Sequence, residues 1–103
     1  MANFSLNHFD AEHGRIIIEC PEFDYDSFAE LGQIFVDLLS AKVIERQQDA
    51  DLHTWLIDFE GCQLMLKGEH YSASMWLEAL STTESQEELK YLATLLKSGA
   101  VRR

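Results

Sequence analysis

The sequence LHTWLIDFEGCQLMLKGEHYSASMWLEAL, residues 52–80, contains both tryptophans and decides the fold. Glycine tolerates the positive φ that tight turns require, so Glu60 and Gly61 are predicted to form a two-residue hairpin loop. Side chains alternate between the two faces of a strand. The position of this loop therefore fixes which residues pair across the hairpin.

One face of the predicted hairpin is apolar and the other is mostly polar. On the apolar face the pairs are Phe59 with Cys62, Ile57 with Leu64 and Trp55 with Leu66. On the second face they are Asp58 with Gln63, Leu56 with Met65 and Thr54 with Lys67. A slip of one residue would mix the two sets, so the pattern itself specifies the register.

The segments before this stretch predict two strands, a helix and a further strand. Residues 3–9 alternate with period two, and residues 15–20 contain three consecutive isoleucines, which favour a central strand. Pro21 ends the second strand because it has no amide proton for the ladder. Apolar residues within 24–40 recur at helical spacing, with Ser27 and Glu30 as a capping box. Residues 42–48 form a weaker strand, whose polar end suits a sheet edge.

The segments after the hairpin predict a last strand and a second helix. The strand covers about residues 72–80, and Thr83 with Gln86 forms a second capping box. An apolar stripe from Leu89 to Leu96 follows, and Gly99 is a typical helix terminator. The order is strand, strand, helix, four strands, helix. This order predicts one α+β domain over residues 1–103, a two-layer sandwich in which two amphipathic helices cover one face of a mainly antiparallel sheet of five or six strands. The last residues, from Val101 on, are expected to be frayed.

Composition limits the classes of partner. The chain has 18 acidic and 8 basic residues, a net charge of −10, so nucleic acids and anionic membrane surfaces would repel it. Its apolar runs are too short to span a bilayer, and no secretory signal is visible, so we expect a soluble cytoplasmic protein. The two cysteines, Cys20 and Cys62, are interpreted as small buried residues and not as a disulfide.

No motif in the chain indicates a catalytic or metal centre. His8, Asp10, Glu12 and His13 lie close together in sequence, but none has the spacing of a zinc motif. The sequence contains no nucleophile elbow and no glycine-rich phosphate loop. We therefore expect no catalytic residues, no metal and no cofactor.

The second face of the hairpin supplies the leading site prediction. If Met75 pairs with Leu66 and Leu77 with Leu64, Trp76 falls opposite Met65. An apolar stripe of Leu56, Met65 and Trp76 would then lie on the face that the helices leave open, and such stripes are typical of interfaces. The alternatives are a one-residue shift that buries Trp76, or coverage of the stripe by the chain's own termini.

Two main hypotheses about function follow. The first is a protein interaction module, either a homodimer or an adaptor, inhibitor or chaperone-like partner of a more basic protein. The second is a small enzyme or ligand binder that uses His53, at the margin of the core, with neighbouring carboxylates. Its candidate pocket comprises His53, Glu69 and Tyr71. The alternative interpretation of His53 is a structural role, in which a ring nitrogen donates a hydrogen bond to a backbone carbonyl. A third hypothesis, mimicry of nucleic acid by an acidic face, has less support.

Overall fold

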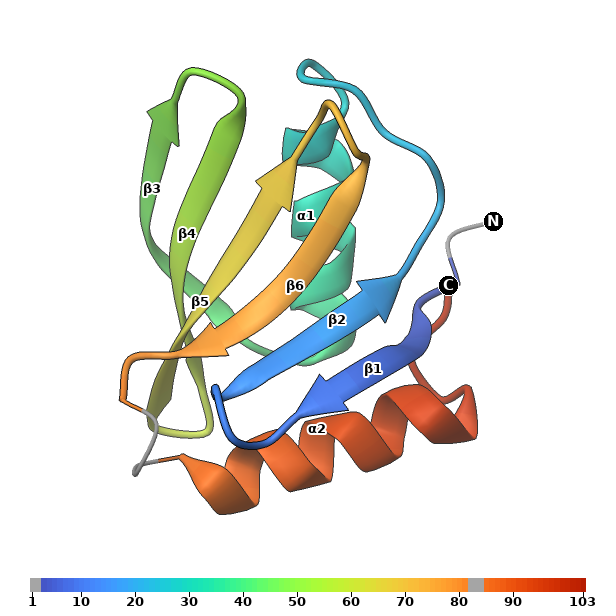
Figure 1. Ribbon diagram of the computed structural model, residues 1–103, viewed down its shortest axis with the longest axis vertical. Coiled ribbons are helices and arrows are strands. Elements are labelled where there is room, and N and C mark those ends of the chain that lie inside the picture. Colours follow the sequence, from blue (N-terminus) through green and yellow to red (C-terminus); the bar gives the residue numbers. More distant parts are fainter. Residues whose placement is uncertain (1–2, 82–84) are drawn as a thin grey trace.

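The computed structural model describes residues 3–81 and 85–103. Within these ranges the elements are β1 (Ser5–Asp10), β2 (Arg15–Glu19), α1 (Phe28–Leu38), β3 (Lys42–Asp49), β4 (Leu52–Phe59), β5 (Cys62–Glu69), β6 (Ser74–Ala79) and α2 (Gln86–Ser98). The strands form one antiparallel sheet in the order β1-β2-β6-β5-β4-β3 (Figure 1). The predicted fold class is confirmed.

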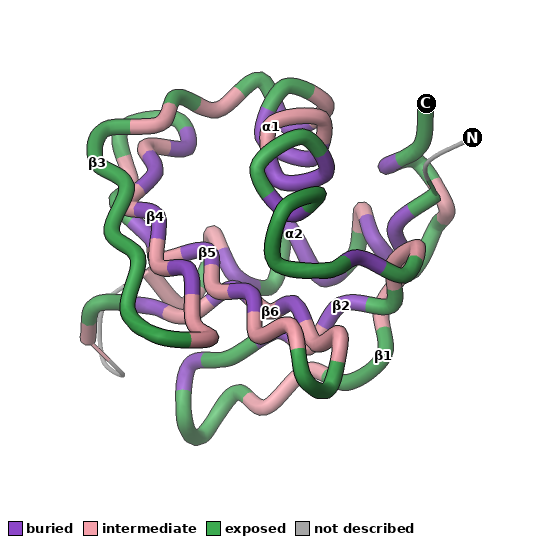
Figure 2. Tube along the Cα trace, turned by 90° about the horizontal axis from the view of Figure 1, so that it is seen from above, coloured by how far each residue is buried: buried purple, intermediate pink, exposed green. Residues whose placement is uncertain are grey.

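Both helices lie on the same side of the sheet (Figure 2). The side chains that point toward them form one buried cluster. Strands β2, β4, β5 and β6 contribute fully buried side chains, and β1 and β3 contribute partly buried ones, such as Leu6 and Val43. Ile16, Ile57, Leu64, Leu66 and Leu77 are completely buried in it. Each such side chain contributes roughly 1.5–3 kcal/mol of burial free energy. Among the described residues, no helix lies on the opposite face of the sheet (Figure 1).

The predicted hairpin of β4 and β5 is confirmed pair by pair. Trp55 lies opposite Leu66, and Leu56 lies opposite Met65, as the alternation requires. Glu60 and Gly61 both have positive φ, +51° and +85°, the conformation that a two-residue hairpin loop needs. The turn is closed by the amide of Gly61, which donates to Oδ1 of Asp58 at 2.9 Å.

Two glycines let α1 approach the sheet closely. A Cβ at Gly32 would lie 3.0 Å from the ring of Trp55, so this glycine permits close packing of α1 on the sheet. A Cβ at Gly68 would lie 2.2 Å from the ring of Phe28, a distance that real atoms do not adopt. Gly68 thus makes room for the aromatic ring at the start of α1.

The start of α1 differs from the prediction. Ser27 precedes the helix but its hydroxyl makes no cap to the helix amides. Instead, the backbone amide of Ser27 donates to Oδ1 of Asp24 at 2.8 Å, and the amide of Asp24 donates to Oγ of Ser27 at 2.9 Å. The reciprocal pair therefore lies one turn earlier than Ser27 and Glu30, because an aspartate three residues upstream competes for the same amide. The second predicted capping box includes Thr83, which lies outside the described residues.

The C-terminal segment is not frayed at Val101, so that expectation is wrong. Val101 is 3% exposed, and its carbonyl accepts a hydrogen bond of 2.9 Å from the amide of Phe4. Asn3 and Arg102 form an antiparallel bridge beside it. Gly99 ends α2 with a φ of +78°, as predicted, and this turn carries the chain back to the core. The terminal residues thus pair with the short segment that precedes β1.

The register of β6 is shifted by two residues from the prediction. Leu77 lies opposite Leu66, Trp76 lies opposite Lys67, and Met65 lies opposite Glu78. The prediction that Trp76 pairs with Met65 is therefore wrong. Because a shift of two residues preserves the face of every side chain, Trp76 still points away from the helices.

Candidate functional site

The open face of the sheet carries a partly exposed apolar stripe. Leu56 and Met65 are direct neighbours on β4 and β5, and Trp76 lies diagonally from Met65 on β6. Ile17 on β2 lies directly opposite Trp76 and extends the stripe across a fourth strand. All four side chains are intermediate in exposure. Sequence reasoning missed Ile17, because the pairing of β2 with β6 joins segments almost sixty residues apart.

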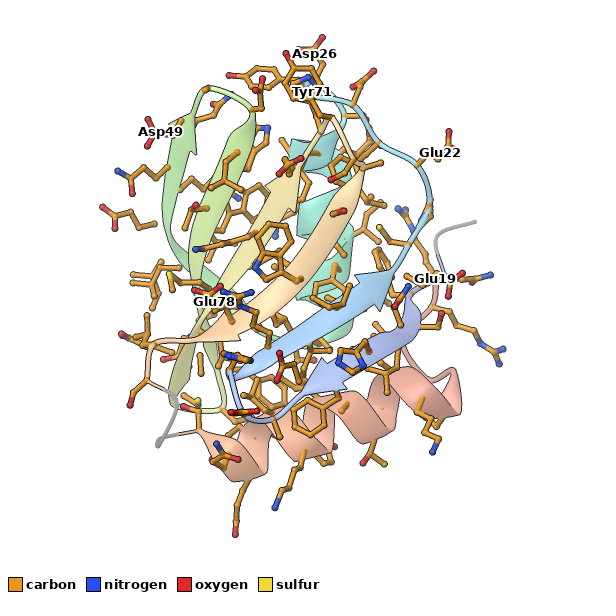
Figure 3. All side chains as sticks on the ribbon, viewed as in Figure 1. Glu19, Glu22, Asp26, Asp49, Tyr71 and Glu78 are labelled. Atoms are coloured by element: carbon orange, nitrogen blue, oxygen red, sulfur yellow. The ribbon has the colours of Figure 1, made fainter. Side chains whose placement is uncertain are left out.

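Glu78 organises the polar groups next to this stripe. Its carboxylate accepts a hydrogen bond from Nε1 of Trp76 at 3.3 Å. It also forms ion pairs with Nζ of Lys67 at 3.3 Å and with Nε of Arg15 at 3.4 Å. Figure 3 shows Glu78 on the side of β6 that faces the viewer, away from α1. These contacts hold the indole of Trp76 in place and pair two cations of the face with a single carboxylate.

The remaining charge of the open face is acidic. By strand alternation and register, this face carries the carboxylates of Asp10, Glu19, Glu45, Asp49, Asp58, Glu69 and Glu78, and the cations of Arg15, Lys42 and Lys67. Two of those cations are already paired with Glu78. The open face around the apolar stripe therefore carries more negative than positive charge.

The residues of the predicted pocket lie apart. His53 points to the helix side of the sheet, with Trp55, whereas Glu69 lies on the open face and accepts a hydrogen bond from the hydroxyl of Ser72. Tyr71 is 78% exposed in the turn after β5 and stacks on His70. Figure 3 places Tyr71 at the same end of the molecule as Asp26. Of the three predicted residues, His53 is the one that lines the cleft described next.

A cleft of about 240 Å³ lies between the start of α1 and the strands β3 and β4. Its lining is contributed by three segments: Tyr25, Asp26 and Ala29 from the start of α1, Arg46, Gln47 and Gln48 from β3, and His53 and Trp55 from β4. The amide of Gln48 donates to the hydroxyl of Tyr25, which links β3 to the segment before α1. A bulge between Val43 and Glu45 turns Arg46 and Gln48 toward this side of the sheet.

His53 is buried in an aromatic cage beside the cleft. It is 5% exposed, stacks on Phe28 with 4.8 Å between ring centroids, and contacts the ring of Tyr25 at 5.0 Å. Burial lowers the pKa of His53, a hydrogen bond with the backbone of Tyr25 opposes this effect, and nearby His70 lowers the pKa further. Nε2 of His53 is buried and has no partner among the described residues. The bond with the Tyr25 backbone therefore falls to Nδ1, and in the neutral form of the ring Nε2 carries an unused lone pair.

Arg46 is held in place without a carboxylate. Its guanidinium carbon lies 4.6 Å from the centroid of the Trp55 ring, and Nη2 donates to Oε1 of Gln33 at 2.5 Å. Within residues 3–81 and 85–103, no ion pair includes Arg46. An arginine fixed by stacking retains most of its five donors for another acceptor.

Neither the cysteines nor the pair of Asp10 and His13 forms a reactive centre among the described residues. Cys20 and Cys62 are both free, the thiol of Cys62 contacts Oγ of Ser85 at 3.0 Å, and burial raises the pKa of Cys20 to about 11. Asp10 and His13 form one hydrogen bond of 2.8 Å, but the part of the chain that the structure describes holds no group of three or more metal-ligating side chains. None of its helices has the length and apolar character needed to cross a membrane.

Fold and surface define a small acidic α+β domain with one uncovered sheet face. A family model described as "Protein of unknown function (DUF3630)" matches residues 4–97, and the chain belongs to this family. No curated protein and no solved structure matches the chain significantly.

Proposed function

We propose that this protein is a protein interaction module that binds a basic partner through its open sheet face. The observation that supports the proposal is the stripe of Ile17, Leu56, Met65 and Trp76 on the face without helices. A sheet of a two-layer domain usually exposes polar side chains on its outer face, so four large apolar residues there favour a partner. Tryptophan and methionine are also enriched in interfaces.

The charge of the chain favours a basic partner over a second copy. Two copies would each bring a net charge of −10 to the interface, with carboxylates around the same apolar stripe on both sides. A partner with an apolar centre and a rim of lysine and arginine would meet complementary potential, which raises association rates and specificity. We place this binding in the cytoplasm, because free cysteines are typical of a reducing compartment.

The test is a pair of matched substitutions. Trp76→Glu puts a charge at the centre of the stripe, whereas Tyr91→Glu makes the same kind of change at an exposed position of α2, on the other layer. We expect Trp76→Glu to abolish partner capture and Tyr91→Glu to leave it unchanged, with circular dichroism showing that both fold. Leu56→Gln, a milder change on the same stripe, should weaken capture if Trp76→Glu proves unstable. Unaltered capture by folded Trp76→Glu would refute the proposal.

A further inference from the structure

A second site lies on the opposite side of the sheet, in the cleft lined by Tyr25, Arg46, Gln48, His53 and Trp55. It is independent of the open face, because these side chains point toward the helix layer. Two of its polar groups have unused hydrogen-bonding capacity. One is Arg46, and the other is Nε2 of His53.

The unpaired nitrogen of His53 has a cost to the fold. A buried nitrogen without a partner loses its hydration and recovers nothing, a penalty that folded proteins generally avoid. Arg46 is exposed, so water satisfies its free donors at no cost to the fold. It is nevertheless fixed over Trp55 in a chain with more than twice as many acidic as basic residues, and no carboxylate of the described residues pairs with it. A ligand carboxylate that accepts from Arg46 and from a protonated His53 would remove the penalty at Nε2.

We propose that this cleft binds a small aromatic carboxylate. The carboxylate accepts hydrogen bonds from the guanidinium of Arg46, whose fork matches carboxylate geometry. The flat body of the ligand lies against the rings of Tyr25 and His53, which are 5.0 Å apart between centroids and already line the cleft. A volume of about 240 Å³ admits a single-ring compound and not a nucleotide.

Binding takes up one proton. The lone pair of Nε2 repels a carboxylate, so His53 must accept a proton from solvent before Nε2–H can donate to the ligand. The charged and titratable groups around the imidazole are Tyr25 and Asp26 before α1, Arg46 on β3 and His70 after β5. The ligand's negative charge offsets the unfavourable effect of Arg46 and His70 on a protonated His53.

The experiment uses the full chain with Trp76→Phe, so that Trp55 at the cleft is its single tryptophan. Benzoate is titrated against benzamide, its neutral isostere, and benzylammonium, its cationic counterpart, with tryptophan fluorescence and amide chemical shifts as readouts. We expect saturable binding of benzoate, at least about tenfold tighter than benzamide. Affinity should rise as the pH falls from 7.5 to 6, and His53→Gln should remove this dependence.

Four substitutions assign the charges. Arg46→Gln should weaken benzoate binding about tenfold or more, Arg46→Lys should restore part of the loss, and Lys90→Gln, an exposed cation on α2, should have no effect. Asp26→Asn should tighten binding, because it removes a carboxylate that lines the cleft. No saturable response to benzoate, or equal binding of benzamide, would overturn the proposal. Binding of benzylammonium that Asp26→Asn weakens would also overturn it, since the cleft would then select an ammonium group.

Discussion

Replacing Gly68 by alanine should lower the free energy of unfolding more than adding one methyl group at any other position of this sheet. The new Cβ would lie 2.2 Å from one ring atom of Phe28 and 2.5 and 2.7 Å from two others. Phe28 is fully buried between His53 and Trp55, so its ring cannot move away without displacing both. Overpacking of this kind costs about 1–3 kcal/mol, and the absence of free space places Gly68→Ala at about 3 kcal/mol.

The assay is urea denaturation followed by tryptophan fluorescence. With an m-value of about 1.5 kcal/mol per M, a loss of 3 kcal/mol lowers the midpoint by about 2 M. Gly61→Ala is the control, because nothing lies within 4 Å of its Cβ and its cost is limited to about 1 kcal/mol of strain at φ +85°. Phe28→Leu in the Gly68→Ala background should recover part of the loss, since it shortens the obstructing side chain. The reasoning is refuted if Gly68→Ala costs no more than Gly61→Ala, or if Phe28→Leu gives no relief.

Three further predictions concern groups whose state the structure fixes. The pKa of His53 in the folded state lies below its usual value of 6.5, so the unfolded state binds more protons below that pH. The free energy of unfolding should therefore fall as the pH drops through 6.5 and level off below the folded-state pKa. Urea midpoints between pH 7.5 and 5 should show this loss, and His53→Gln should reduce it. Val101→Ala should cost about 1.5 kcal/mol, the burial of two methylene equivalents, whereas a neutral effect in thermal unfolding would mean that the tail is frayed after all. Cys20, with a pKa of about 11, should react with iodoacetamide at pH 8 about a hundredfold more slowly than a free cysteine peptide. The rate is measured by mass spectrometry in the Cys62→Ser protein, in which Cys20 is the one remaining cysteine. Equal rates for the protein and the peptide would contradict the burial of Cys20.

The local pattern of the sequence was sufficient for most of the architecture. The alternation from Trp55 to Leu66 around Glu60 and Gly61 contains the pairing of β4 and β5 in full, because each slip would expose apolar side chains. The helices were also predictable from a local pattern, since their apolar residues recur with a helical period. The edge position of β3 also followed from its polar sequence, and Figure 2 shows it exposed along almost its whole length.

Long-range pairing and irregular backbone were not predictable. The turn between β5 and β6 spans residues 70–73 and includes Ala73 at a φ of +50°, a conformation that glycine usually marks, so its length and the register of Trp76 could not be fixed. The bulge at Ile44 changes which face the following residues of β3 occupy. Without it, Arg46 and Gln48 would point away from His53, and the cleft would not exist.

The candidate open face was therefore predictable in part and the cleft hardly at all. Leu56 and Met65 share a face through a local hairpin, whereas Ile17 joins them only through the pairing of β2 with β6. The cleft needs three segments that the sequence separates, the start of α1, β3 and β4. The position of His53 at the margin of the core indicated the cleft, but the residues that surround His53 depend on tertiary packing.

Site-specific photo-cross-linking in the cells that make this chain is the sharpest test of whether the open face binds a basic protein. A photoreactive phenylalanine analogue at Met65 lies in the stripe, and the same analogue at Lys90 lies on the exposed side of α2 and serves as control. We expect one cross-linked adduct from Met65, with a protein of basic isoelectric point, and none from Lys90. A homodimeric adduct, the same adduct from both positions, or no adduct from Met65 would contradict the proposal.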